Sequence, residues 1–255
     1  MRYVAIGDSF TEGVGDELQD GTPRGWADLV AAGLSAALAE RGETVEYANL
    51  AIRGRLLLPI VTTQLDAALA LQPAADLITL NGGGNDMMRT GFDLAALIAQ
   101  TEQAIDRCAA AGVRLVVLSG ADPSAQLPFG RIMRRRATDL TAAVAEVCAR
   151  REVTFVDAFG DVEIRDRHYW SPDRLHLNGD GHQRVAGLVL HALGYGPLPV
   201  PGTRGSAGRQ SVVANARYYR EHVLPWVRRR LRGHSSGDDR DPKYAQWQPV
   251  GASRG

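Results

Sequence analysis

The sequence predicts an α/β fold, a three-layer α/β/α sandwich built on a five-stranded parallel sheet. Short apolar runs alternate with longer segments whose apolar residues recur every three or four positions, and polar residues that could carry chemistry follow several of the runs. Strands that are joined through helices lie parallel in one sheet, and the helices cover both of its faces. With 255 residues, 45% of them hydrophobic, the chain is long enough for one well-buried domain.

Five short apolar runs are the expected strands: 3–6, 44–48, 76–80, 113–118 and 153–156. The expected helices cover 26–38, 56–71, 92–111, a long segment that ends near 151, and 181–193. Gly42 and Gly112 directly follow two of these helices and predict where they end. Pro59 is compatible with a helix only near its first turn. Because an open parallel sheet binds ligands outside the carboxyl ends of its strands, the residues after the strands are the candidate site.

Ser9 stands where the first expected strand must turn, and it is the candidate nucleophile. A serine hydroxyl needs a histidine within hydrogen-bond reach and a third group that holds this histidine in one tautomer. Asp173 and His176 fit these roles, because an offset of three residues in a tight turn places both side chains on one side of the chain. The sequence therefore predicts Ser9, His176 and Asp173 as catalytic residues.

Acyl transfer also needs donors that face the oxyanion as it forms. Three candidates follow expected strands: the Ser9 amide, the Gly54 amide and the Asn85 side chain. Gly54 lacks a Cβ, so its backbone can approach a ligand closely.

Four blocks in this order resemble the SGNH hydrolases, also called the GDSL esterases and lipases. They are Gly7-Asp8-Ser9 with Glu12-Gly13, the stretch from Asn49 to Gly54, Gly83-Gly84-Asn85-Asp86, and Asp173 to His176. The resemblance runs from about residue 2 to 195 and implies a flavodoxin-like fold, Ser9 as nucleophile, Gly54 and Asn85 as oxyanion donors, and Asp173 with His176 as the rest of the triad. Phe10 departs from the family pattern, which usually has leucine there.

Other enzyme classes fit less well. The α/β-hydrolases share the order Ser, Asp, His, but their nucleophile lies in Gly-x-Ser-x-Gly between a strand and a helix. Residues 7–11 lack the second glycine, and the full pattern occurs at 233–237, in a polar tail after an arginine cluster. The glycine-rich stretches 13–15 and 82–84 complete no nucleotide-binding pattern, so we expect no cofactor. The remaining histidines share no metal-ligand spacing, and His182 is expected at an exposed helix start, so no metal is predicted.

The expected substrate is a small-molecule ester with a small to medium acyl group, a choice that rests on the resemblance. Acyl transfer and carbohydrate O-deacetylation remain open on the same triad. A catalytically silent domain that binds through its C-terminal segment is the alternative of another class. Tyr169 and Trp170 directly precede the triad residues and form either an aromatic wall for the substrate or ordinary packing.

Charge divides the chain into an acidic body and a basic C-terminal part. Residues 201–255 hold 11 Lys+Arg against 4 Asp+Glu, a net charge of +7, and the first 200 residues carry −7.

We expect a hydrolase domain over 1–196, a Pro/Gly linker over 197–211, a basic amphipathic helix over 212–232 and a disordered tail over 233–255. The helix is expected to pack on the acidic body, and contact with an anionic membrane surface or with a partner molecule is the alternative. No nucleic-acid partner is expected, and the sequence gives no oligomeric state.

The predicted location is cytoplasmic, because the first strand begins at Tyr3 with no signal-peptide pattern before it and no apolar run is long enough to span a bilayer. Cys108 and Cys148 lie in helical patterns and are expected to be reduced, buried thiols.

Overall fold

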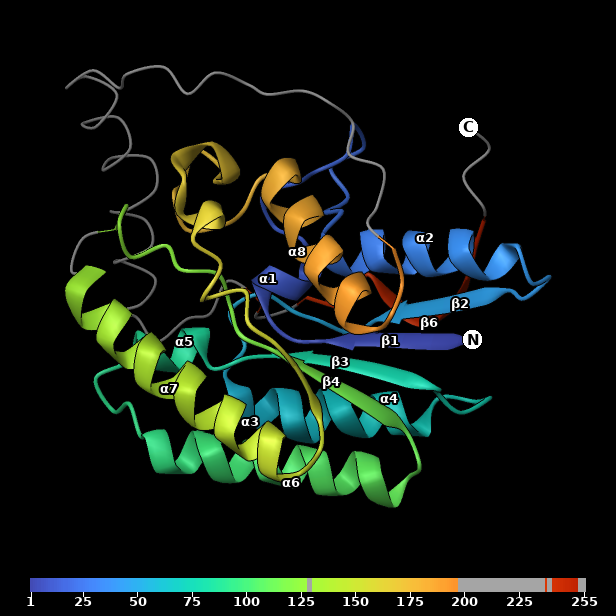
Figure 1. Cartoon of the computed structure of the whole chain (residues 1–255), viewed down its shortest axis with the longest axis horizontal. Coiled ribbons are helices and arrows are strands. Elements are labelled where there is room, and N and C mark those ends of the chain that lie inside the picture. Colours follow the sequence, from blue (N-terminus) through green and yellow to red (C-terminus); the bar gives the residue numbers. More distant parts are fainter. Residues whose placement is uncertain (128–129, 197–236, 238–239, 252–255) are drawn as a thin grey trace.

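A single six-stranded sheet forms the centre of the computed structural model, which describes residues 1–127, 130–196, 237 and 240–251. The strands lie in the order β5-β4-β3-β1-β2-β6 (Figure 1). The first five are mutually parallel and β6 is antiparallel to β2. Their bounds are β1 Arg2–Ile6, β2 Val45–Asn49, β3 Leu77–Asn81, β4 Arg114–Leu118, β5 Thr154–Val156 and β6 Tyr244–Val250.

Helices cover both faces of the sheet (Figure 1). Helices α2 and α8 pack against each other on one face, and α3, α4, α6 and α7 cover the other. The bounds are α1 Ser9–Glu12, α2 Trp26–Ala39, α3 Leu57–Pro59, α4 Leu65–Ala70, α5 Gly84–Met87, α6 Leu94–Ala110, α7 Gly130–Arg150 and α8 Gly179–Ala192, with a π-helical turn η1 at Ile60–Gln64 and 3-10 turns η2 at Glu163–Arg165 and η3 at Arg167–Tyr169. The fold is therefore the predicted α/β/α sandwich.

Strand β1 explains why the sheet can be covered on both sides. Residues 3–6 of this strand are completely buried, and their side chains alternate between the two cores. Ala5 pairs with Asn49 of β2 and with Thr79 of β3, so β1 lies at the centre of the sheet and delivers Ser9 to the middle of its carboxyl edge.

The predicted strand and helix ranges are confirmed to within a few residues at each end. The segment expected as one helix over 56–71 is divided into α3, η1 and α4, with Pro59 in the first turn. Polar side chains begin two of the longer helices: Asp93 accepts a hydrogen bond from the amide of Ala96, and Asn178 accepts one from Gly181.

The sixth strand corrects the expected count of five strands and, for residues 244–250 alone, the expected disorder of the tail over 233–255. Strand β6 pairs with the edge of β2, and Tyr244 packs against Tyr47 with ring centroids 6.0 Å apart. The polar composition indicates disorder, but backbone pairing with the free edge of β2 orders residues 244–250. The expected linker over 197–211 and basic helix over 212–232 lie outside the described residues, so surface binding by this segment stays a prediction.

Both cysteines are buried and unpaired, as expected, and burial raises the pKa of each thiol to about 11. In the part of the chain that the structure describes, no helix has the length and apolar character needed to cross a membrane.

Candidate active site

Ser9 is the first residue of α1, directly after the turn that ends β1. Asp8 caps this helix by accepting a hydrogen bond from the amide of Phe10 at 3.1 Å, and Gly13 ends it at φ 99°. A Cβ at Gly7 would overlap the side chain of Thr11 and lie 2.9 Å from the carbonyl oxygen of Asn81. Only glycine lets the chain turn this tightly between β1 and Ser9.

A continuous hydrogen-bond chain joins the three predicted catalytic residues. Nε2 of His176 lies 3.1 Å from Oγ of Ser9, and Nδ1 lies 2.6 Å from Oδ2 of Asp173. Since Asp173 can only accept when ionised, Nδ1 carries the proton and Nε2 is free to accept from the serine hydroxyl. The geometry is that of a nucleophile, a base and a group that orients the base.

Local hydrogen bonds hold Asp173 in this position. Oδ1 of Asp173 accepts from the hydroxyl of Ser171 at 2.6 Å, and from the amides of Leu175 and His176 at 2.9 and 3.0 Å. Burial opposes ionisation of the carboxyl, but the hydrogen bond and charge of His176 and these further donors outweigh it. The pKa of Asp173 therefore lies well below its usual range, and the carboxylate is ionised throughout the neutral range.

Gly54 lies in the loop between β2 and α3 with φ 76°, a conformation that favours glycine. Its neighbour Arg53 is bound to Glu12, the last residue of α1. The Glu12 carboxylate accepts from the Arg53 amide at 2.7 Å and from Arg53 Nε at 2.9 Å. This nearly buried ion pair, which the sequence reasoning did not foresee, ties the Gly54 loop to the helix that carries Ser9.

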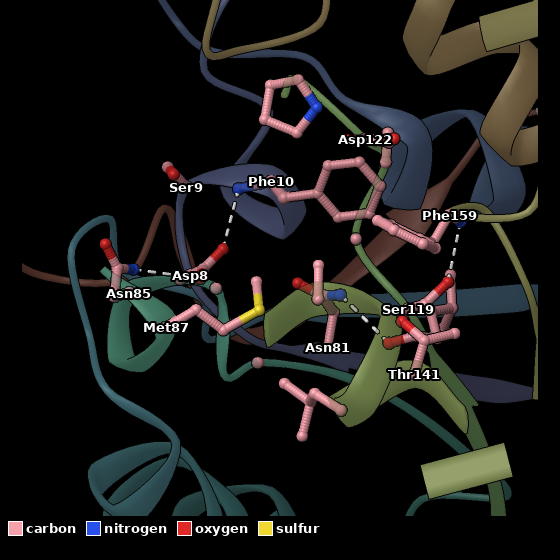
Figure 2. A pocket seen from close by; sticks show the side chains of 18 of the residues that line it. Asp8, Ser9, Phe10, Asn81, Asn85, Met87, Ser119, Asp122, Thr141 and Phe159 are labelled. Carbon is pink, nitrogen blue, oxygen red and sulfur yellow. Dashed lines mark hydrogen bonds between the residues drawn. The ribbon is translucent and has the colours of Figure 1, made fainter. Parts of the chain in front are cut away.

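Asn85 lies in α5, with its side-chain amide turned toward Asp8 (Figure 2). Its Nδ2 donates to Oδ2 of Asp8 at 3.0 Å and to the carbonyl oxygen of Arg55 at 3.0 Å. Burial raises the pKa of Asp8 to about 6. An oxyanion that takes a hydrogen bond from Asn85 must displace or share one of these two acceptors.

A cavity of about 310 Å³ opens at Ser9, His176, Gly54 and Asn85 and extends between β4 and α7. Figure 2 shows Ser9 and Asn85 on one side of it and Ser119, Thr141 and Phe159 on the other. Its inner wall is mainly apolar and includes Val117, Leu118, Ala137, Leu140, Val144, Phe155 and Phe159. The arrangement suits an apolar group attached to a carbonyl that sits at the mouth.

Of the two aromatic residues considered for a substrate wall, one lines the cavity and the other does not. Trp170 lines the cavity, is buried, and donates from Nε1 to the carbonyl oxygen of Ile164 at 2.8 Å. Tyr169 is not among the cavity residues; its hydroxyl donates to Glu163 at 2.5 Å, and the guanidinium of Arg184 lies over its ring. The structure therefore brings only Trp170 to the candidate site.

His182 corrects the expectation of an exposed helix start, because its side chain is completely buried. Its Nδ1 accepts from the amide of Trp26 at 3.2 Å, and its Nε2 lies 3.3 Å from the carbonyl oxygen of Val14. Burial lowers the pKa of His182 to about 4, so the ring is neutral and serves as a structural link. Over the described ranges, no three His, Cys, Asp or Glu residues are grouped to hold a metal ion.

Comparisons with known proteins give the family of the chain. The model of the GDSL-like lipase/acylhydrolase family matches residues 5–184, which is more than half of the chain. A search of the curated proteins returned no match.

Solved structures share the fold. The acetylxylan esterase Axe2 from Geobacillus stearothermophilus, as a catalytic mutant, has a TM-score of 0.63 at 19% identity, with 78% of this chain and 96% of that chain covered. The lipase Lip_vut3 from a goat rumen metagenome has a TM-score of 0.61 at 19% identity, with 77% and 98% covered. TesA has a TM-score of 0.60 at 22% identity, with 76% and 98% covered. At these identities the structures show the fold, and the match over residues 5–184 shows the family: the chain belongs to the GDSL-like lipase/acylhydrolases.

Proposed function

We propose that this ester hydrolase works through an acyl-enzyme formed on Ser9. The observation that supports the proposal is the hydrogen-bond chain from Ser9 through His176 to Asp173, which opens onto the mainly apolar cavity. No residue outside this set is needed to supply a nucleophile and a base, and the chemistry requires no cofactor.

In the first half-reaction Ser9 Oγ attacks the ester carbonyl while His176 Nε2 removes the hydroxyl proton. Asp173 keeps the proton of Nδ1 in place and stabilises the imidazolium that forms. The tetrahedral intermediate then collapses, and His176 returns the proton to the leaving alcohol. In the second half-reaction water attacks the acyl-enzyme by the same proton transfers and releases the acid.

The amides of Ser9 and Gly54 and the side chain of Asn85 stabilise the negative oxygen of both intermediates. Asn85 does so by giving up or sharing its hydrogen bond to Asp8 or to the Arg55 carbonyl oxygen. Each donor in such a set contributes about 3 kcal/mol to the barrier reduction.

The acyl group occupies the cavity between β4 and α7. At about 310 Å³ the cavity lies at the small end of the range of roughly 300 to 1,000 Å³ for small-molecule sites, which suits a small to medium acyl chain. Its mainly apolar wall favours a hydrocarbon chain over a sugar ring. Acyl transfer on the same triad would differ only in an alcohol replacing water in the second half-reaction.

The test is hydrolysis of p-nitrophenyl esters from acetate to laurate by the wild type and Ser9→Ala, with a fluorophosphonate adduct located by mass spectrometry. We expect turnover by the wild type, an adduct on Ser9, and loss of both in Ser9→Ala. A rate optimum at acetate with turnover of acetylated sugars would favour a deacetylase. Persistent turnover by Ser9→Ala, or absence of turnover and adduct in the wild type, would contradict the proposal, and the latter would favour the silent domain.

A further inference from the structure

The family match ends at residue 184, yet a later segment lies against the candidate site. We call Gly237 and residues 240–250 the C-terminal strap. Its strand β6 lies beside β2 (Figure 1). The two strands are antiparallel, with Val250 opposite Val45 and Tyr244 opposite Asn49. The strap therefore reaches the carboxyl end of β2, where the loop that contains Gly54 begins.

Lys243 inserts from the strap into the body of the protein. Its side chain is only 8% exposed, and its Nζ donates to the carbonyl oxygens of Glu12 at 2.8 Å and Pro23 at 2.7 Å and to Oδ2 of Asp28 at 2.6 Å. These are the three hydrogen bonds that an ammonium group can donate. A buried ammonium with all three donors used fixes the end of α1, the following loop and the start of α2 relative to one another.

Glu12 links this anchor to the candidate oxyanion loop. Its carbonyl oxygen accepts from Lys243, while its carboxylate binds the backbone amide and guanidinium of Arg53, which precedes Gly54. Because Glu12 ends the short helix that Ser9 begins, Lys243 is connected to both Ser9 and Gly54 through one residue.

Gly237 makes a second, separate contact with the same loop. A Cβ at this position would overlap the carbonyl oxygen of Arg53 and lie 2.8 Å from the side chain of Ile52. The carbonyl oxygen of Gly237 also accepts from the guanidinium of Arg55 at 3.4 Å. The strap thus touches the loop on both sides of Gly54.

We propose that the C-terminal strap positions the Ser9 helix and the Gly54 loop for acyl transfer, with Lys243 and Gly237 as its positioning residues. The inference rests on the proposed function, because it assigns the strap to the geometry of that site. Catalytic rates are sensitive to displacements of about 1 Å in the groups that hold the reacting atoms. If β6 only covered a sheet edge, its loss would lower stability and leave the chemistry of each folded molecule unchanged.

The test uses Lys243→Met and Gly237→Ala in the full chain. Lys243→Met keeps the length of the stem and removes the three hydrogen bonds; Gly237→Ala pushes the strap from Arg53 without touching Lys243. The matched controls are Arg240→Met, at an exposed position, and Gly251→Ala, where a Cβ would meet nothing within 4 Å. The readouts are the melting temperature and the kcat and KM on p-nitrophenyl butyrate. The kcat is expressed per active site, with the number of sites determined by titration with a fluorophosphonate.

We expect kcat per titrated site to fall about tenfold or more in both variants, with KM changed less than twofold and both controls at the wild-type rate. If both variants keep the wild-type kcat per site and lose only thermal stability, the strap is a structural cover and the proposal is overturned. Should Lys243→Met fail to fold, Gly237→Ala decides between these outcomes.

Amide hydrogen exchange tests the positioning role of the strap without depending on catalytic activity, so it can fail or succeed independently of the proposed function. The Gly13 amide donates to the Ser9 carbonyl oxygen, and the Ile52 amide donates to that of Gly7, so these two amides report on the helix and the loop. We expect them to exchange faster in both variants and not in the controls. An inactive wild type with this exchange pattern would overturn the proposed acyl-enzyme function and leave the positioning role of the strap intact. Unchanged exchange in both variants would overturn the positioning role itself.

Discussion

Nε2 of His176 lies 3.1 Å from Oγ of Ser9, although the two residues are 167 positions apart in the chain. Ser9 is placed by the buried strand β1, and His176 by a turn that the hydrogen bonds of Asp173 hold closed. The contact needs the whole sheet to form, so it links the fold directly to the proposed chemistry.

Replacing Asp173 with asparagine should cost about a thousandfold or more in kcat. An amide has no net charge to stabilise the imidazolium, and it can present N–H to Nδ1 and so favour the wrong tautomer of His176. Steady-state kinetics at neutral pH measures this loss, with Asp20→Asn on an exposed loop as the control. A loss below tenfold, in a variant that folds normally, would show that Asp173 does not orient His176.

Removing the Asn85 side-chain donor by Asn85→Ala should lower kcat about a hundredfold or more, equivalent to about 3 kcal/mol. The KM should change far less, because the ground-state carbonyl gains little from this donor. Circular dichroism must show an intact fold, since Asn85 also joins Asp8 to the Arg55 carbonyl oxygen. A kcat equal to that of the wild type would exclude Asn85 from the oxyanion site.

Acid should destabilise the protein through His182. Burial lowers its pKa from 6.5 to about 4, so its contribution to stability is complete above about 6.5 and is lost as the pH falls toward 4. The shift corresponds to a loss on the order of 3 kcal/mol. His182→Gln can keep both hydrogen bonds without titrating, so urea unfolding should show a smaller decrease between pH 7 and pH 4 than in the wild type.

The comparison with His182→Gln is needed because Asp8 acts in the opposite direction. Its pKa is raised to about 6, so its contribution to stability is present at low pH and is lost as the pH rises through about 6. Equal pH dependence in the wild type and His182→Gln would contradict the assignment of a neutral, buried His182.

Filling the cavity at Ala137 should shift the acyl preference toward shorter chains. Ala137 is a buried residue of α7 in the cavity wall, so Ala137→Leu reduces the space between α7 and β4. We expect the kcat/KM for p-nitrophenyl octanoate to fall at least tenfold relative to acetate. Ala142→Leu, on the exposed side of the same helix, should leave this ratio unchanged. An unchanged ratio in both variants would place the acyl chain elsewhere.

The parts of the structure that depend on local sequence could be predicted. The parallel strands are short apolar runs buried on both faces, and the site motifs lie in short blocks with fixed spacing. The side chains of Ser9, Asp173 and His176 meet because Ser9 directly follows β1 and the turn with Asp173 and His176 precedes α8, both at the carboxyl edge of the sheet.

The parts that depend on contacts distant in sequence could not be predicted. Tyr244, Trp247 and Val250 are the less exposed residues of β6, and their spacing of three does not show the alternation typical of a strand. Lys243 appears in a polar tail, and its burial follows only from the acceptors that α1 and α2 supply. Tyr169 and Trp170 are adjacent and both aromatic, and nothing local shows which of the two faces the cavity.

In the proposed mechanism Ser9 carries the acyl group during turnover. The most direct measurement is rapid-quench mass spectrometry of the wild type mixed with p-nitrophenyl butyrate, with p-nitrophenol release followed in parallel. We expect butyrylated Ser9 within the first turnover, at up to one acyl group per active site, and none in His176→Ala. Turnover with no acylated Ser9, together with activity retained in Ser9→Ala, would contradict this mechanism.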